Sequence, residues 1–216
     1  MSSIDQSTTS QSEIAYDKLY EAIRKGVFLP GDRVRETDVA QKLGLSRTPV
    51  RDALRRLEAE GIVEHRPRLG AVIRKLAQSE IVELYEMRIV LERTAAELAA
   101  KHATEAEIEE FADLNEAILV AENNPAEAAR LNAILHRSIY RAGRNRFLLE
   151  SSRALNNALM LLGPTTLDDP ERILEVHTQH AAIIDNLRKR DQSAAGQAAV
   201  AHINTSLRHR LKALRG

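Results

Sequence analysis

Apolar residues near the start of the chain recur at the spacing of one helical face. A first helix is therefore expected from Ile14 onward. Its apolar face consists of Ala15, Leu19, Ala22 and Ile23. Gly26 is placed to end this helix in a left-handed conformation, and residues 29–32, Leu-Pro-Gly-Asp, are typical of a turn.

Two further helices are expected with only a short turn between them. Thr37 is a candidate N-cap for the first of the two, and Gly44 is placed to end it. Ser46 is the candidate N-cap of the second, which we expect to run to about Glu60. Its buried stripe is formed by Val50, Leu54 and Leu57.

A second stripe on this third helix is basic and exposed. It consists of Arg47, Arg51 and Arg55, and it begins at the helix N-terminus, where free N–H groups attract phosphate. Two β-prone segments, 62–63 and 71–73, follow on either side of a basic turn and predict a hairpin. This order of elements is typical of a winged helix-turn-helix, whose third helix enters the major groove of DNA.

Residues 78–216 have long helical periods and no convincing strand pattern. Short breaks divide this region into six or seven amphipathic segments. They fall near Thr104, Pro125, Gly143, Pro164 and Pro170, with a weaker one at Asp191. We expect an antiparallel helical bundle, because short loops join neighbouring apolar stripes. The predicted fold class is thus mainly α: an N-terminal winged helix-turn-helix followed by a bundle of six or seven helices.

Composition narrows the class of protein further. The 31 basic and 31 acidic residues cancel, but residues 11–77 hold 14 Lys/Arg against 10 Asp/Glu, whereas residues 78–216 hold 17 against 20. This split favours two modules with different partners. The chain has no cysteine, which excludes disulfides and thiolate metal sites. No long apolar run or secretory signal is evident, so we expect a cytoplasmic protein without membrane contact.

These patterns predict three segments. Residues 1–11 are polar and are expected to form a disordered tail. Residues 12–76 are expected to form the DNA-binding domain. Residues 78–216 are expected to form an all-helical domain that binds an effector and mediates dimerisation.

Histidines are the candidate chemical groups of the helical region. His136, His180 and His202 lie on inward faces of three different predicted helices, and Asn132 precedes His136 by one turn. Such histidines can converge on zinc, nickel or copper. The alternative is that each is a separately hydrogen-bonded interior histidine.

Residues 46–51 read Ser-Arg-Thr-Pro-Val-Arg and are followed by Ala-Leu-x-x-Leu-x-x-x-Gly at 53–61. With this motif the chain resembles the DNA-binding domain of the GntR family of bacterial transcription regulators, over nearly all of residues 14–75. The resemblance implies that Ser46, Arg47, Thr48 and Arg51 contact DNA and that Gly70 at the wing tip approaches the minor groove. Further contacts are expected from Arg35, Arg55 and Arg68, with a solvated charge as the alternative for each.

Three segments of the helical region form a second motif: 85–92, Asn132-x-x-x-His136 followed by 142–145, and His180 to His202. With these segments the region resembles the FCD ligand-binding domain of FadR-type members of that family. The resemblance implies a divalent metal, zinc or nickel, held by Asn132, His136, His180 and His202, although the motif usually has Asp at position 132. It also implies a small carboxylate effector bound by Arg88, whose alternative role is an ion pair with Glu92. Asn156 is a further candidate for the effector site.

The function expected from both resemblances is a ligand-responsive transcription regulator, and a repressor is expected because family repressors often release DNA when liganded. It would bind an inverted-repeat operator as a homodimer and respond to a small organic acid. One alternative is a DNA-binding regulator whose helical domain only dimerises. The other is a metal-dependent enzyme, which the sequence disfavours because no His-Glu-x-x-His motif or nucleophile–base pair is evident. We expect no enzymatic activity.

Overall fold

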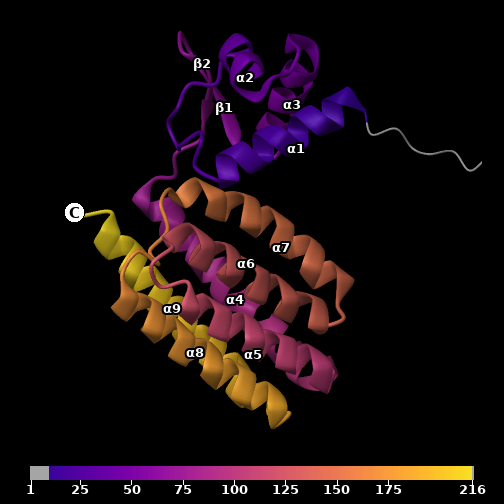
Figure 1. Ribbon diagram of the computed structural model, residues 1–216, viewed down its shortest axis with the longest axis vertical. Coiled ribbons are helices and arrows are strands. Elements are labelled where there is room, and N and C mark those ends of the chain that lie inside the picture. The colour runs from indigo at the N-terminus through magenta and orange to yellow at the C-terminus, as the bar shows by residue number, and fades with distance from the viewer. Residues whose placement is uncertain (1–9, 216) are drawn as a thin grey trace, which may run out of the picture. The chain divides into compact units, whose positions relative to one another are not determined.

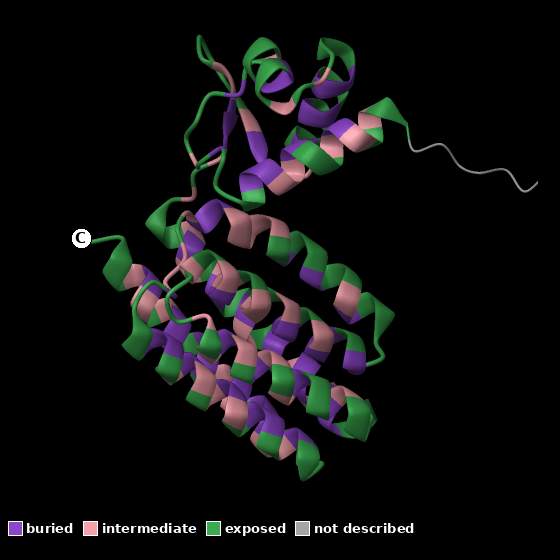
Figure 2. Cartoon of the chain, in the orientation of Figure 1, coloured by how far each residue is buried: buried purple, intermediate pink, exposed green. Residues whose placement is uncertain are grey.

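The computed structural model describes residues 10–215, so the tail predicted at the N-terminus lies mostly outside the described residues. The described chain contains nine α-helices, one 3₁₀ turn and two strands (Figure 1). It divides into two compact units. The first comprises residues up to Leu76 together with Asn157–Gly163, and the second comprises Ala77–Asn156 with Pro164–Gly216. Each unit has its own buried core (Figure 2).

Three helices build the first unit: α1 (Gln11–Arg24), α2 (Glu36–Leu43) and α3 (Arg47–Ala59). Helices α1 and α2 both pack on α3. The apolar stripe of α3 is buried as predicted, and the apolar face of α1 meets it. Helix α1 begins three residues before Ile14, because Ser10 caps it by accepting a hydrogen bond from the Glu13 N–H.

Helix α2 ends as the sequence predicted, at Gly44, but it does not begin as predicted. Gly44 has a φ of 64°, a left-handed conformation that glycine adopts without a Cβ penalty. The prediction of Thr37 as N-cap is wrong, because Arg35 occupies that position and Thr37 lies in the first helical turn. Glu36 and Asp38 in that turn suit the positive end of the helix dipole, which favours the earlier start.

The predicted wing is present as an antiparallel hairpin of β1 (Val63–Arg66) and β2 (Gly70–Ile73). Val63 pairs with Ile73 and Arg66 pairs with Gly70. A single bridge joins Arg33 to Val72 beside this hairpin. The first unit is therefore a winged helix-turn-helix, as the sequence predicted.

The segment Asn157–Gly163 belongs to the first unit, although the sequence placed it in the helical region. The Asn157 side chain accepts a hydrogen bond from the Tyr20 hydroxyl at 3.0 Å and donates one to Glu60 at 3.2 Å. Leu161 is buried in the apolar core of the same unit. The first unit is thus completed by residues distant in sequence.

Six helices build the second unit, as predicted. They are α4 (Gln78–His102), α5 (Glu105–Val120), α6 (Pro125–Ala142), α7 (Arg146–Leu159), α8 (Pro170–Arg188) and α9 (Gln192–Ala213). A 3₁₀ turn, Met160–Leu162, follows α7. Helix α4 packs on α6, α8 and α9, and α5 packs on α6 and α8.

Small residues allow α4 and α9 to approach closely. Alanines of α4 at 95, 96, 99 and 100 are buried, and so are Ala195, Gly196 and Ala199 of α9. A Cβ at Gly196 would lie 2.7 Å from Oε1 of Glu97, so the Glu97 side chain packs directly against this glycine. Among residues 10–215 there is no helix both long enough and apolar enough to cross a membrane.

Thr104→Ala is expected to lower the free energy of unfolding by about 1 kcal/mol, which corresponds to a fall in Tm of about 2–4 °C. Thr104 caps α5: its hydroxyl accepts from the Glu107 N–H, and the Glu107 carboxylate accepts from the Thr104 N–H. Thermal unfolding followed by circular dichroism measures the change.

Thr178→Ala is the matched control, because Thr178 is exposed in the middle of α8 and its hydroxyl bonds only the Leu174 carbonyl. Alanine is the better helix former, so this variant should lose no stability. Equal losses in both variants would contradict a capping role for Thr104.

Candidate nucleic-acid interface and metal centre

The N-terminus of α3 presents three exposed residues of the predicted DNA contacts: Ser46, Arg47 and Thr48. Ser46 occupies the N-cap as predicted, but its side chain makes no capping hydrogen bond, so the hydroxyl is available to another acceptor or donor. Arg47 has a single weak contact with Glu36 at 3.5 Å. This end of the helix therefore offers exposed polar groups together with the positive end of the helix dipole.

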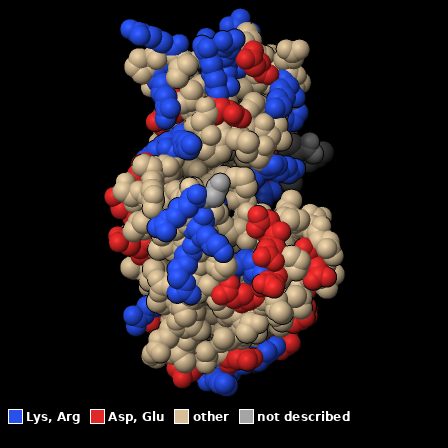
Figure 3. All heavy atoms as spheres, turned by 90° about the vertical axis from the view of Figure 1, so that its left-hand side faces the viewer, with Lys and Arg blue, Asp and Glu red and all other residues tan. Residues whose placement is uncertain are grey.

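A shallow groove of about 430 Å³ runs between α3 and the wing. It gathers four of the sequence-predicted contacts, and Arg33 joins them. The predicted members are Arg35, Arg51, Arg55 and Gly70. On the face that Figure 3 shows, Lys and Arg side chains gather over the first unit, at the top of the view.

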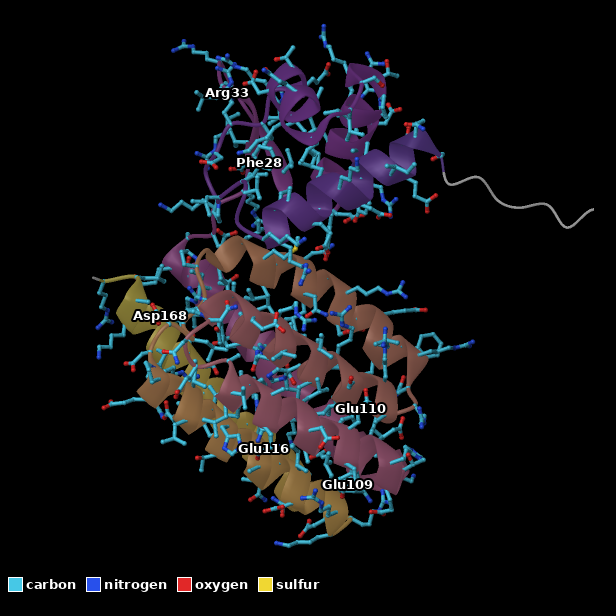
Figure 4. The ribbon with its side chains drawn as sticks, viewed as in Figure 1. Phe28, Arg33, Glu109, Glu110, Glu116 and Asp168 are labelled. Carbon is cyan, nitrogen blue, oxygen red and sulfur yellow. The ribbon has the colours of Figure 1, made fainter. Side chains whose placement is uncertain are left out.

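Arg33 is a candidate contact that the sequence reasoning missed. Its backbone pairs with Val72, and its guanidinium lies 4.0 Å from where a Cβ on Gly70 would stand. Its side chain extends at the edge of the unit (Figure 4). The only available signal was a basic residue following the turn at 29–32, which does not distinguish a contact from a solvated charge.

Arg68 lies at the tip of the wing with a φ of 67°. A positive φ is unfavourable for a residue with a Cβ, and such residues cluster at functional sites. The wing thus presents an exposed arginine in a conformation that the turn to Gly70 imposes.

Three histidines from three helices meet in the interior of the second unit. His136 comes from α6, His180 from α8 and His202 from α9, and all three are buried. Each offers a ring nitrogen within 4.8 Å of the others. We refer to these three residues as the histidine triad.

Each ring of the triad is oriented by an oxygen acceptor at its Nδ1. The partners are Glu92 Oε2 at 2.9 Å for His136, Asn115 Oδ1 at 3.1 Å for His180, and Gln179 Oε1 at 2.8 Å for His202. The Asn115 amide donates to the His177 carbonyl, which fixes its oxygen toward His180. Each Nδ1 therefore faces an oxygen partner, and each Nε2 lies on the side of the ring away from that partner.

The Nε2 atoms of His136 and His180 are buried and have no hydrogen-bond partner within the described structure. Buried polar atoms are normally satisfied, so these two indicate a missing partner. An outer shell of carboxylate and amide oxygens that leaves the facing nitrogens open is the usual arrangement around a metal-binding histidine. The donor set fits a borderline divalent ion such as zinc or nickel.

Electrostatics favour neutral imidazoles at His180 and His202. Burial, followed by neighbouring histidine and arginine charges, lowers the pKa of His180 and of His202 well below the usual value. Burial alone would raise the pKa of Glu92, but His136 and Arg88 outweigh burial and hold it below its usual value. The result is one buried carboxylate in the same cluster as two neutral rings, His180 and His202, which suits a cation.

Arg88 lies beside the triad and is only 8% exposed. Its Nε donates to Oε1 of Glu92 at 3.3 Å, so the ion pair that was the alternative reading of this arginine is formed. The charge of Arg88 also acts on His180 and His202. Arg88 therefore both pairs with Glu92 and lies close to the triad.

The remaining sequence candidates are placed differently. Asn132 lies on α6, one turn before His136, and is half-buried. Asn156 is exposed, unlike the triad, so we leave it out of the effector site. Outside the triad, His102 is exposed, whereas His177 and His209 pair with Glu116 and Glu175 respectively. Glu116 is labelled on α5 in Figure 4.

Sequence reasoning missed several residues around the triad. Asn115 had a detectable signal, because it is an amide within the apolar stripe of α5, between Phe111 and Ile118. The apolar pattern of α8 did not single out Gln179. Arg172 is 4% exposed, and its charge acts on His180 and His202. It pairs with Glu175 at 2.8 Å and Ser206 at 3.1 Å.

A basic winged helix-turn-helix followed by a helical unit with an internal polar site defines a transcription regulator with a sensory domain. Family comparisons agree with this class. Residues 11–73 match "Bacterial regulatory proteins, gntR family", and residues 83–205 match "FCD domain". The chain belongs to the GntR family of transcriptional regulators and carries an FCD domain.

Relatives of similar length support this assignment. The chain is 30% identical over 197 residues to the "Uncharacterized HTH-type transcriptional regulator YdhC" of Bacillus subtilis, covering 90% of this chain and 88% of that protein. It is 35% identical over 202 residues to the "Probable D-xylose utilization operon transcriptional repressor" of Paenarthrobacter nicotinovorans, covering 91% and 86%.

Solved structures share the fold. Escherichia coli McbR/YncC matches with a TM-score of 0.82 at 20% identity, over 96% of this chain and all of that one. A GntR transcriptional regulator from Rhodococcus sp. RHA1 matches with a TM-score of 0.78 at 25% identity, over 95% and 99%. The order of a winged helix-turn-helix and a helical unit is thus common to these proteins.

Proposed function

We propose that this regulator is a repressor that binds an inverted-repeat operator as a homodimer and releases it when a small carboxylate binds beside a metal in the histidine triad. The observation that carries the proposal is the orientation of the triad. All three Nδ1 atoms bond internal oxygens, and two buried Nε2 atoms lack any partner within the described residues.

The DNA-binding part of the proposal follows from the face formed by α3 and the wing. Exposed Ser46, Arg47 and Thr48 begin α3, and Arg51 lies one turn further along it. In winged helix-turn-helix proteins the corresponding helix enters the major groove, and a dimer reads two half-sites. A second copy of the chain would therefore read the other half of an inverted repeat.

The metal part of the proposal rests on three residues of this chain. His136, His180 and His202 would hold zinc or nickel through Nε2, and Asn132 is a candidate fourth ligand through its amide oxygen. A bound divalent ion supplies a Lewis acid with open positions for carboxylate oxygens. Arg88 would orient that carboxylate, because its guanidinium is already buried beside the triad.

Repression is favoured over activation by relatives whose names describe repressors. These are the D-xylose utilization operon regulator and "HTH-type transcriptional repressor NanR" of E. coli, which is 26% identical over 215 residues, covering 90% of this chain and 82% of that protein. An effector can release DNA only if it binds the DNA-free state more tightly than the DNA-bound state.

Effector-dependent release is the expected result when acids are added to the metal-loaded protein on its operator. The operator is first selected from a random duplex library with the full-length chain. Fluorescence anisotropy then measures the Kd for that duplex at fixed salt, with and without a panel of hydroxy, oxo and simple carboxylic acids. A rise in Kd of about 5- to 150-fold is expected for the effector, the usual range of coupling between sites.

The alternatives give different results in the same assay. No change in Kd or in Tm with any acid would support a helical unit that only dimerises. Consumption of an acid, followed by nuclear magnetic resonance, would support the metal-dependent enzyme. A fall in Kd with an acid would make the protein an effector-activated DNA binder and would contradict the release mechanism.

A further inference from the structure

Tyr140 places a buried hydroxyl on the helix that carries His136, and no described residue bonds to it. It lies one turn after His136 on α6, and these two side chains therefore share a helix face. Tyr140 is 4% exposed, and its hydroxyl oxygen has no hydrogen-bond partner among the described residues. A buried hydroxyl without a partner costs free energy, so a partner is expected in the functional state.

The surroundings of this hydroxyl make it a donor rather than an anion. Burial and then the Glu92 carboxylate raise the pKa of Tyr140, while the charge of Arg88 acts in the opposite direction. The phenol stays protonated near neutral pH. Glu92 also bonds His136 and Arg88, so the hydroxyl lies in the same charged cluster as the proposed metal ligand and effector-binding arginine.

Nothing else in the proposed site requires Tyr140. The three rings of the triad have their own Nδ1 partners, and Arg88 has Glu92. Arg88 and the metal would bind the carboxylate of an effector. The unassigned donor is therefore suited to a second oxygen of the same small molecule.

We propose that Tyr140 donates a hydrogen bond to a hydroxyl or oxo oxygen next to the carboxylate of the effector, which makes the effector a 2-hydroxy or 2-oxo acid. This inference rests on the proposed carboxylate-binding function and narrows the class of acid. Tyr140 would then distinguish such an acid from a simple carboxylic acid, because a simple acid leaves the buried hydroxyl unpaired.

Matched pairs of acids test the inference with the full-length, zinc-loaded protein. The pairs are L-malate and succinate, L-lactate and propionate, 2-oxoglutarate and glutarate, and citrate and tricarballylate. Isothermal titration calorimetry gives each Kd. For at least one pair we expect the oxygenated acid to bind about tenfold more tightly than its partner, the discrimination expected of one hydrogen bond.

Tyr140→Phe is expected to remove that preference and to keep the zinc content of the wild type. Binding of the simple acid should be unchanged, since Arg88 and the triad are intact. A variant that keeps the tenfold preference would overturn the role of Tyr140 and leave carboxylate sensing in place. If the wild-type protein bound none of the acids, both the proposed effector class and this inference would fail.

Stability without ligand gives a second, independent measurement. Tyr16→Phe is the matched control, because the Tyr16 hydroxyl donates to Glu60 at 2.7 Å. Tyr16→Phe should lower the Tm, whereas Tyr140→Phe should leave the Tm unchanged or raise it, because no bond within the protein is lost. A Tyr140→Phe protein that is as destabilised as Tyr16→Phe, or that does not fold, would assign the hydroxyl a structural partner and overturn the inference.

Discussion

His180→Ala is expected to abolish stoichiometric binding of zinc or nickel. His180 is 1% exposed, its Nδ1 is held by Asn115, and its Nε2 has no other partner among the described residues. Removing this ring leaves two imidazoles and the neutral amide of Asn132, which is too few donors for the usual four-coordinate arrangement. Elemental mass spectrometry on protein made without a histidine tag should find about one metal ion per wild-type chain and none in the variant.

Metal-induced stabilisation provides the second measurement of the same prediction. At a free zinc concentration 100 times its Kd, binding stabilises the wild-type fold by about 2.7 kcal/mol. For a chain of this size that is a rise in Tm of roughly 5–11 °C. The comparison is made within each variant, with and without zinc, because the cavity left by His180→Ala lowers stability by itself.

His102→Ala is the control for this experiment, since His102 is exposed at the end of α4 and lies outside the triad. It should bind metal and gain stability as the wild type does. Retention of one metal ion per chain by His180→Ala would contradict the proposed centre. Loss of metal from His102→Ala as well would point to a surface site.

The fold was predictable from the sequence because its signals are local. The apolar stripe of α3, the glycine after α2 and the paired β-prone segments each act within a few residues, and the structure confirms all three. The failure at Thr37 has a similar local cause. Glu36 and Asp38 stabilise a helix start at Arg35 through the helix dipole, whereas the Thr37 hydroxyl would stabilise a later start as an N-cap.

The composition of the first unit was not predictable, because it depends on a contact between distant segments. Asn157 bonds Tyr20 and Glu60, and Leu161 enters the core of that unit. The pattern of α7 is an ordinary amphipathic helix and carries no sign of this contact. Hydrophobic periodicity identifies a buried face but not the surface that covers it.

The histidine triad was predictable as a set of residues but not as a chemical site. Spacing places His136, His180 and His202 on inward helix faces, and the structure brings their rings together. Which ring nitrogen faces inward depends on Glu92, Asn115 and Gln179, which come from α4, α5 and α8. Only the packing of these helices assigns each acceptor to its ring.

Arg51→Ala is expected to weaken operator binding by about 1–3 kcal/mol, or about 5- to 150-fold in Kd. Arg51 is exposed on α3 and lines the groove between that helix and the wing. An arginine on the exposed face of this helix can make a two-point contact with guanine when the helix enters the major groove. Fluorescence anisotropy at fixed salt measures the Kd, because phosphate contacts make binding strongly salt-dependent.

Comparison with a scrambled duplex separates base recognition from charge. If Arg51 reads a base, the Arg51→Ala protein should lose affinity for the operator but much less for the scrambled duplex, so the ratio of the two Kd values falls. A phosphate contact would lower both affinities alike. Arg24→Ala is the matched control: Arg24 is a basic residue of the same unit, but it lies on α1 and pairs with Glu21. It removes the same charge without touching the groove, so an equal loss in Arg24→Ala would reduce the role of Arg51 to net charge.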